Sequence, residues 1–412
     1  MALSKFQRTR LAKVLNYEDA RRFARRTLPR AVFDYVDGGT EDEVTMRRNT
    51  EGFRDLRFRP RMGVWVPEPQ LSTTLFGQTV SFPVLTAPCG GLRLIHPQAD
   101  IGVAGASASA GTIHIASSSS SFSLEEIAAS SPDRHWFQLY RFMGRAGMES
   151  LVNRAKAAGY KAIVATVDTQ VGSKRERNWR NGFSYSMRVN AANALKLGPQ
   201  LAPRPFWLAR YILDGMPFQL ANTAGMTRDG LPMSLPEMGY KESNSPTWED
   251  VAWVRQNFEG PVLVKGVLTA EDARRALEVG CDGVVVSNHG GRQLDGAPAA
   301  VDVLPEVVAA VGGELEILVD GGVRRGSDVL KALALGAKAV LIGRPYVWGL
   351  ALGGQDGVSH VLELLRAEMR RSMQLMGCAS IHDLDHTWLT RAGSPISSGP
   401  GTTSWRSEPA GR

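Results

Sequence analysis

Residues Pro261 to Asn288 read PVLVKGVLTAEDARRALEVGCDGVVVSN, and this stretch decides the fold class. A short apolar run opens the stretch and another closes it, and each ends in glycine or polar residues. Between them, Ala270 to Gly280 has a helical pattern. Strands buried on both faces read as continuous apolar runs, and their alternation with helices indicates a parallel sheet. The stretch therefore predicts one strand–helix–strand unit.

Apolar runs of this kind recur along the chain, and most of them are followed by a helical pattern. The eight runs are PVLTAP (83–88), IHIASS (113–118), WFQLY (136–140), AIVATVD (162–168), PVLVKG (261–266), GVVVSN (283–288), EILVDGG (316–322) and AVLIGRP (339–345). Eight strand–helix units favour a closed (β/α)8 TIM barrel of the α/β class over an open doubly wound sheet.

The remaining segments predict the domain organisation. Residues 1–75 are expected to form an N-terminal helical cap, and residues 76–390 the barrel. Residues 182–247 form a long insertion after the fourth strand, and its aromatic stretch LAPRPFWLARYILDGMPF (201–218) predicts a lid or packing segment. Docking of that stretch on a membrane surface is the alternative. Residues 391–412 are rich in Ser, Gly, Thr and Pro and are expected to be a disordered tail.

The charge distribution limits the partners of the chain. Its net charge is +7 over 412 residues, and basic residues gather in the N-terminal region. We interpret them as a solvated basic face, with an anionic partner or a membrane surface as the alternative. The chain lacks a basic module rich in aromatic residues, so no nucleic acid is expected as a partner.

Cysteine usage and hydropathy indicate the compartment. The three isolated cysteines argue against a disulfide framework and fit a reducing cytosol. The N-terminus lacks the apolar run of a signal peptide, and the chain has no run of 18 apolar residues. We therefore expect a cytoplasmic protein that is at most peripheral on a membrane.

Chemically active residues follow the ends of the predicted strands, which open on one face of such a barrel. The last two units supply DGGVRRG (320–326) and Gly343-Arg344. Glycines let backbone N–H groups approach a ligand closely, a helix N-terminus favours negative charge, and arginine adds a bidentate fork. These units predict a phosphate site.

The other units supply titratable side chains, namely Tyr140, Asp168, Arg175, Lys265, His289 and Arg292. None of the His, Cys, Asp and Glu residues has metal-ligand spacing, so no metal is expected. A cofactor anchored by its phosphate and facing a histidine base and two arginines fits the oxidation of a small carboxylic acid.

The segment SNHGGRQLDG (287–296) resembles the signature of the FMN-dependent α-hydroxy acid oxidases and dehydrogenases, which include glycolate oxidase, L-lactate dehydrogenase and mandelate dehydrogenase. The resemblance runs from about Tyr17 to about His382 in one register. Further blocks with family counterparts are FDYVDGG (33–39), APCG (87–90), FQLY (137–140), TVD (166–168), RERNWRNGF (175–183), LVKG (263–266) and DGGVR (320–324).

The resemblance implies FMN as the cofactor and a homo-oligomer such as a homotetramer. The phosphate of FMN is expected at Gly322, Arg324, Gly343 and Arg344. Its ring is expected at Ser117, Gln138 and Thr166, with the backbone of Cys89 and Gly90 against N5 and Lys265 beside N1. The implied cofactor-binding set also includes Pro88, Ser287, Asp320 and Gly321.

The resemblance also implies the catalytic roles. His289 is expected to be the base, oriented by Asp168, and Lys265 to stabilise the reduced flavin. The substrate carboxylate is expected at Arg175, Arg292 and Tyr35, and the substrate oxygen at Tyr140. The implied substrate is a small-molecule (S)-2-hydroxy acid, and the electron acceptor is left open between oxygen, a quinone and a cytochrome.

Two positions depart from the glycolate oxidase pattern. Ser119 stands where those enzymes have a bulky aromatic residue, and Gly90 stands where several oxidases have alanine. The small residue at 119 predicts room for a substrate side chain of lactate size or larger, including an aryl group, with a roof contributed by Phe206-Trp207. The stretch GRPYVWGLALGGQDGV (343–358) also resembles a flavoenzyme that matures the peptide cofactor mycofactocin.

Three alternative functions follow from these features. The first is an enzyme of the same family acting on a modified peptide or another specialised metabolite. The second is a flavin-binding partner protein without turnover, and the third a non-oxidative barrel flavoenzyme such as type 2 isopentenyl diphosphate isomerase.

Overall fold

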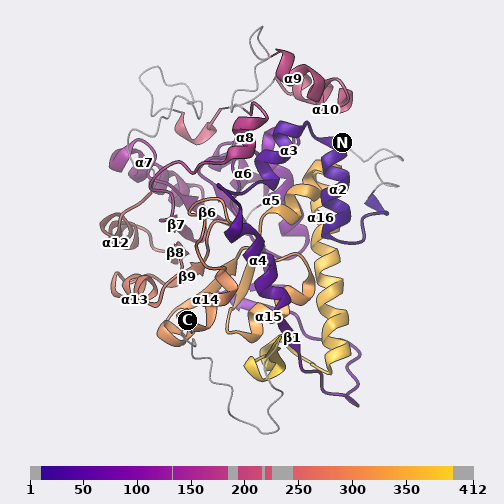
Figure 1. Ribbon diagram of the computed structural model, residues 1–412. Helices are drawn as coiled ribbons and strands as arrows, with labels where there is room; N and C mark the ends of the chain where they lie inside the picture. Colours follow the sequence, from indigo (N-terminus) through magenta and orange to yellow (C-terminus); the bar gives the residue numbers. More distant parts are fainter. Residues whose placement is uncertain (1–10, 132, 184–193, 216–218, 225–244, 393–412) are drawn as a thin grey trace, which may run out of the picture.

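The computed structural model describes residues 11–131, 133–183, 194–215, 219–224 and 245–392. Its centre is a closed parallel barrel of eight strands, in the order β10-β11-β4-β5-β6-β7-β8-β9 (Figure 1). The strands are β4 (Val84–Thr86), β5 (His114–Ser117), β6 (His135–Leu139), β7 (Ile163–Thr166), β8 (Val262–Val267), β9 (Gly283–Val286), β10 (Glu316–Asp320) and β11 (Ala339–Ile342). Each matches one of the eight predicted runs to within one residue, which confirms the (β/α)8 fold.

Burial on both faces explains why the strands read as continuous apolar runs. Successive side chains of a strand point to opposite faces. In β9, Val285 belongs to the apolar cluster that fills the barrel, whereas Val284 and Val286 belong to the cluster between the barrel and its helices. All three valines are fully buried. A strand with two buried faces therefore carries no polar alternation.

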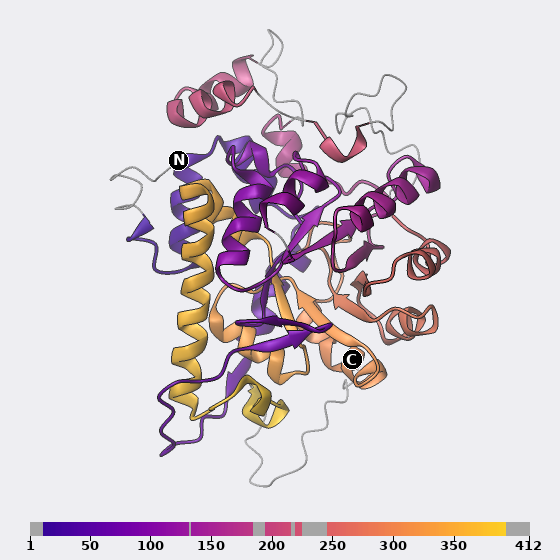
Figure 2. The same ribbon diagram turned by 180° about the vertical axis from the view of Figure 1, so that it is seen from behind.

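A ring of helices surrounds the barrel (Figures 1 and 2). They are α5 (Ala99–Ser109), α6 (Leu124–Ser130), α7 (Gly144–Ala157), α12 (Trp248–Asn257), α13 (Ala270–Glu278), α14 (Ala300–Val311), α15 (Gly326–Ala334) and α16 (Arg344–Met376). The hairpin of β2 (Thr73–Leu75) and β3 (Gln78–Val80) belongs to the amino-terminal end of the barrel, because Leu75 and Val80 join the interior cluster.

The N-terminal segment is helical only in its first part. It forms α2 (Tyr17–Thr27), α3 (Arg30–Asp37) and α4 (Val44–Arg54), and α2 packs beside α16 (Figures 1 and 2). Residues 56–75, which we expected to be helical, instead contain β1 (Leu56–Phe58), an extended chain and β2. Three prolines within 60–69 disfavour a helix there. β1 pairs with β12 (Leu389–Arg391), near the C-terminal end of the described chain.

Helix α8 (Glu176–Arg180) precedes the insertion, which contributes α9 (Ala194–Leu201), α10 (Pro205–Leu213) and the 3-10 turn η2 (Ala221–Thr223). In Figure 1, α9 and α10 lie at the outer edge of the molecule, above α3. A hydrogen bond of 2.8 Å from the Ala31 N–H to Gln200 Oε1 connects α9 to α3. Residues 184–193, 216–218 and 225–244 of the insertion, and residues 393–412 of the predicted disordered tail, lie outside the described residues.

Candidate active site

A cavity of about 240 Å³ opens at the carboxyl ends of the barrel strands. It brings together nearly every predicted site residue, although these come from all parts of the chain. Its lining includes Tyr35, Pro88, Cys89, Gly90, Ser117, Gln138, Tyr140, Thr166, Arg175, Lys265, His289, Arg292, Asp320, Gly321, Gly322, Arg324, Gly343 and Arg344. Asp168 and Ser287 do not line it but bond directly to residues that do.

His289 and Asp168 form a hydrogen-bonded pair at the cavity wall. The Nδ1 of His289 lies 3.0 and 3.2 Å from the two carboxylate oxygens of Asp168. Burial alone would raise the pKa of Asp168, but the charge and hydrogen bond of His289 and the charge of Lys265 hold it below its ordinary value. Asp168 therefore stays a carboxylate that binds the Nδ1 proton and leaves Nε2 to accept another.

His289 sits in a strained turn. Its φ of 58° is left-handed, and Gly290 and Gly291 continue with φ of 65° and 71°. A histidine in this region stores roughly 1–3 kcal/mol of backbone strain, which the surrounding structure has to hold. The Ser287 hydroxyl accepts the His289 N–H at 3.0 Å and so stabilises the turn. A strained non-glycine residue at a cavity favours a functional role for His289.

Lys265 is a buried cation beside the same turn. Its side chain is 4% exposed, and its Nζ lies 2.9 Å from the Asp320 carboxylate and 2.7 Å from the Ser287 hydroxyl. Burial opposes the charge, but the carboxylates of Asp320 and Asp168 raise the pKa of Lys265 above its ordinary value. The cavity wall therefore carries a fixed positive charge.

Three polar atoms at the cavity test whether a flavin ring fits. Gln138 Nε2, Thr166 Oγ1 and Asp320 Oδ1 are buried and have no hydrogen-bond partner in the described part of the chain. The Oε1 of Gln138 already accepts from the Ser117 hydroxyl at 3.1 Å. Buried polar groups in proteins are nearly always bonded, so these atoms fit a ligand rich in donors and acceptors such as an isoalloxazine ring.

The phosphate end lies where α15 and α16 begin. Gly322 has a φ of 86°, and a Cβ on it would lie only 2.0 Å from the Asn49 carbonyl oxygen, so only glycine fits. Arg324 lies over the ring of Tyr17, 4.4 Å from its centroid. Glycine backbone, an arginine and two helix N-termini together suit a phosphate dianion.

The guanidinium of Arg344 bonds the protein backbone. It donates to the carbonyl oxygens of Val36, Gly38 and Gly290, each at 2.9 Å. These bonds hold the end of α3 against the turn after His289. Arg344 still lines the cavity, but its part in holding a phosphate would come from its place in the first turn of α16.

The predicted substrate residues Tyr35, Tyr140, Arg175 and Arg292 line the same cavity. Arg292 lies over the ring of Tyr35 at 5.3 Å and donates to the Gly38 carbonyl oxygen at 2.8 Å. Arg175 Nε lies 3.1 Å from the Ser173 hydroxyl. Burial and the charge of Asp168 raise the pKa of Tyr140, so it remains a phenol that can donate a proton. Two arginines and a phenol suit a carboxylate with an adjacent oxygen.

The apolar side chains of the cavity lining include Leu92, Ile95 and Phe142, and Ser119 belongs to the same lining. Gly90 lies so close to Ser119 that an added Cβ would approach the Ser119 Cβ to 2.8 Å. The two small residues therefore adjoin each other in the cavity.

The predicted roof over this space is wrong. Phe206 is 85% exposed, and neither it nor Trp207 lines the cavity. The indole N–H of Trp207 instead donates to the Leu94 carbonyl oxygen at 2.9 Å, and Arg93 forms a bidentate ion pair with Asp214. These bonds attach α10 to the 3-10 turn η1 (Leu92–Leu94), outside the cavity.

Helix α4 supports the turn around His289, and the sequence alone does not reveal this contact. Asn49 and Asn288 exchange side-chain hydrogen bonds of 2.9 and 2.8 Å, and both are buried. The Gly291 N–H donates to Asn288 Oδ1 at 3.1 Å. No local signal marks Asn49 for this role, because its partner lies 239 residues away.

Asp100 on α5 is a fully buried carboxyl group with no well-formed hydrogen bond within the described residues. Burial raises its pKa from 3.8 to about 7, and the nearby Ser120 hydroxyl opposes this shift only in part. Between these two values the native state binds more protons at this site than the unfolded state. Its contribution to stability is therefore fully present below about pH 4 and falls as pH rises to about 7.

Asp100→Asn should remove this pH dependence, because the amide stays neutral. In urea unfolding of the holoenzyme, we expect the variant to gain roughly 2–3 kcal/mol relative to wild type between pH 5 and pH 8. The difference in unfolding free energy between the variant and wild type at pH 5 shows how well the site accommodates the amide. A difference between the two proteins that is constant from pH 5 to pH 8 would contradict the raised pKa.

Within the residues that the structure describes, no helix combines the length and apolar character needed to cross a membrane. The same residues contain no group of three or more His, Cys, Asp and Glu side chains placed to hold a metal ion.

Comparison with known proteins adds to this geometry. A family model described as FMN-dependent dehydrogenase matches residues 24–391. An L-lactate oxidase from Nostoc sp. is 41% identical over 391 residues, covering 92% of this chain and 99% of the relative. Glycolate oxidase 1 from Zea mays is 39% identical over 392 residues, covering 95% of this chain and 99% of the relative.

Solved structures give a similar result. The chain resembles the crystal structure of the monotopic membrane protein (S)-mandelate dehydrogenase with a TM-score of 0.86 and 37% identity, covering 92% of this chain and all of that one. It also resembles a mutant mandelate oxidase with (S)-mandelic acid, with a TM-score of 0.77 and 38% identity over 93% of this chain and 99% of that one.

Proposed function

The chain belongs to the FMN-dependent dehydrogenase family, and on this premise we propose that it oxidises (S)-2-hydroxy acids with an apolar side chain, lactate or larger, to 2-oxo acids. The observation that carries the proposal is the His289–Asp168 pair facing the same cavity as Arg175 and Arg292. A proton acceptor and a carboxylate-binding pair in one small cavity match a 2-hydroxy acid.

The protein residues would divide the work as follows. Arg175 and Arg292 would bind the substrate carboxylate, and the phenol of Tyr140 would donate to the substrate oxygen. His289 would accept the departing proton at Nε2, and the imidazolium so formed would be stabilised by the Asp168 carboxylate at Nδ1. The His289–Asp168 pair and the two arginines would thus fix one orientation of the substrate.

FMN, the cofactor of this family, supplies the acceptor for the two electrons that leave the substrate. Gln138, Thr166 and Asp320 would bond its ring, since their orphaned polar atoms need partners. The buried charge of Lys265 would favour negative charge on the ring. Gly322, Arg324 and the first turn of α16 would hold its phosphate.

The size of the substrate side chain is inferred from the apolar part of the cavity. The cavity lining combines the small residues Gly90 and Ser119 with apolar side chains that include Leu92, Ile95 and Phe142. The names of the relatives span glycolate, lactate and mandelate, so family membership leaves this choice open. The apolar wall supports a substrate larger than glycolate.

A substrate panel tests this proposal. We expect (S)-lactate or (S)-mandelate to exceed glycolate in kcat/KM by about 10–200-fold, which is the range that one or two apolar groups provide in a fitted pocket. The (S) enantiomer of mandelate should exceed the (R) enantiomer. Anaerobic flavin reduction by glycolate, (S)-lactate and both mandelates gives the comparison. Preference for glycolate or for the (R) enantiomer would show that the cavity has been misread.

The same panel bears on the alternatives. Flavin bleaching by any simple 2-hydroxy acid would contradict a partner protein without turnover and a non-oxidative flavoenzyme. Bleaching by none of them would favour a modified peptide or other specialised substrate. The electron acceptor, the homo-oligomer, the cytoplasmic location and the membrane contact of the insertion stay predictions.

A further inference from the structure

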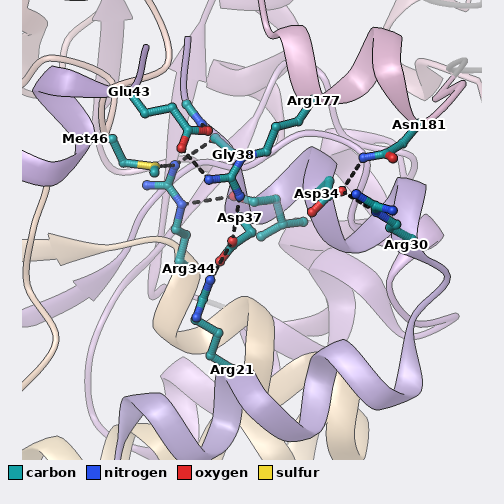
Figure 3. Close-up of polar contacts among 12 residues, drawn as sticks. Arg21, Arg30, Asp34, Asp37, Gly38, Glu43, Met46, Arg177, Asn181 and Arg344 are labelled. Carbon is teal, nitrogen blue, oxygen red and sulfur yellow. Dashed lines mark hydrogen bonds and ion pairs between the residues drawn. The ribbon is translucent and has the colours of Figure 1, made fainter. Parts of the chain in front are cut away.

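Asp37, the last residue of α3, is a buried carboxylate held between two arginines (Figure 3). Its side chain is 5% exposed and accepts from Arg21 at 2.6 and 2.8 Å and from Arg177 Nη1 at 3.0 Å. Burial would raise the pKa of Asp37, but the bond to Arg21 and the charges of Arg21, Arg344 and Arg177 lower it below its ordinary value. Asp37 therefore remains ionised.

The backbone around Asp37 binds two arginines that line the cavity. The carbonyl oxygens of Val36 and Gly38 each accept from both Arg292 and Arg344, with 2.8 Å between Arg292 Nη1 and the Gly38 oxygen. These carbonyls end a helix, where the helix dipole favours cations. The end of α3 thus touches Arg292 at the substrate end and Arg344 near the phosphate end.

Arg175 is attached to the same segment from both sides. Before it, the Lys174 carbonyl oxygen accepts the Glu41 N–H at 3.0 Å. After it, Arg177 bonds Asp37 and also forms an ion pair with Glu43. Figure 3 shows the Arg177 side chain reaching both carboxylates from α8. The position of Arg175 at the start of α8 therefore depends on the anions of residues 37–43.

We propose that Asp37 is a positioning residue for the substrate clamp, which sets the places of Arg175 and Arg292 through Arg177 and the end of α3. Arg21 and Arg177 both bond Asp37, and the charge of Arg344 also acts on it, so without the Asp37 charge these cations would repel one another. Movement of α8 or of the end of α3 would then displace the two clamp arginines. This inference rests on the proposed function, because it takes Arg175 and Arg292 as the carboxylate clamp.

The test measures carboxylate binding separately from turnover. Oxalate, which has no hydroxyl-bearing carbon to oxidise, is titrated into the FMN-loaded enzyme by calorimetry. We expect Asp37→Asn to weaken oxalate binding about tenfold or more, since small displacements of binding groups have large effects. Asp37→Glu keeps the charge and should recover most of the affinity.

Glu18→Gln is the matched control. Glu18 also faces Arg21, at 3.8 Å, but its side chain is 72% exposed and lies on α2, away from the clamp arginines. Its neutralisation should leave oxalate affinity within about twofold, as expected for an exposed ion pair. The proposal would be overturned if Asp37→Asn bound oxalate as tightly as Glu18→Gln does. It would also be overturned if Asp37→Glu did not recover the affinity that Asp37→Asn loses.

Kinetics distinguish positioning from general loss of structure. In anaerobic reduction by a 2-hydroxy acid, Asp37→Asn should raise the apparent dissociation constant of the substrate more than it lowers the limiting rate, because the His289–Asp168 pair is untouched. We expect the variant and wild type to contain equal amounts of FMN, which would exclude a general loss of structure. A fall in the limiting rate alone would overturn the assignment.

Glu43→Gln keeps the proposal testable if Asp37→Asn does not fold. This substitution removes the other carboxylate that pairs with Arg177, so it should also weaken oxalate binding. Unchanged oxalate affinity in Glu43→Gln would then count against the proposal. Failure of the proposed function looks different. Wild-type flavin would then not be bleached by any 2-hydroxy acid, while oxalate binding would still respond to Asp37.

Discussion

Replacement of His289 by alanine is expected to lower the rate of flavin reduction by about 10²–10⁴-fold while FMN stays bound. The imidazole is the proposed proton acceptor at the cavity, and its Nδ1 is already engaged by Asp168 at 3.0 Å. The residues proposed to bond the flavin ring and phosphate are not changed. Anaerobic stopped-flow reduction with saturating 2-hydroxy acid measures the loss, and the flavin absorbance measures FMN retention.

His386→Ala is the control for this experiment. His386 is exposed and does not line the cavity. Its removal should leave the rate unchanged. Reduction of the His289→Ala variant at a rate near that of wild type would place the base elsewhere in the cavity.

Replacement of Arg292 by lysine is expected to lower kcat/KM by roughly 10²-fold or more, although the charge is kept. Lysine offers a point charge in place of the planar fork that matches the two oxygens of a carboxylate. It would also lose the stacking on Tyr35 and the geometry of the bond to the Gly38 carbonyl oxygen. Steady-state kinetics with the best substrate of the panel measure the effect.

Arg61→Lys provides the comparison, since Arg61 also lies over an aromatic ring, that of Trp388 at 3.8 Å, but does not line the cavity. This variant should keep wild-type kcat/KM. If Arg292→Lys also kept it, Arg292 would not belong to the carboxylate clamp.

The sequence was sufficient for the barrel because the signal for a doubly buried strand is local. In a run such as GVVVSN (283–288), the apolar residues indicate a buried strand and the polar residues indicate where it ends. Alternation with helices indicates parallel pairing. The closed barrel then brings the residues that follow each strand to one face. His289, Lys265 and Asp320 could therefore be placed together without knowledge of a single contact.

Contacts between side chains distant in sequence were not predictable in this way. Asn49 supports Asn288, and Asp37 holds Arg177, through hydrogen bonds whose partners no periodicity reveals. The aromatic stretch of the insertion predicts a lid or packing segment, but the pattern does not show which surface the aromatic side chains contact. Phe206 is exposed, and Trp207 packs outside the cavity wall.

The sequence by itself determined the eight strands, their closure into a barrel, the family and the residues that gather at the cavity. These follow from burial patterns and from short motifs, in which neighbouring residues carry the information. Only the tertiary structure decided that Arg344 binds the end of α3 and that Asp37 binds both Arg21 and Arg177. A guanidinium can reach any acceptor within several ångströms, so its partner depends on which distant segments the fold brings there, and no local pattern contains that choice.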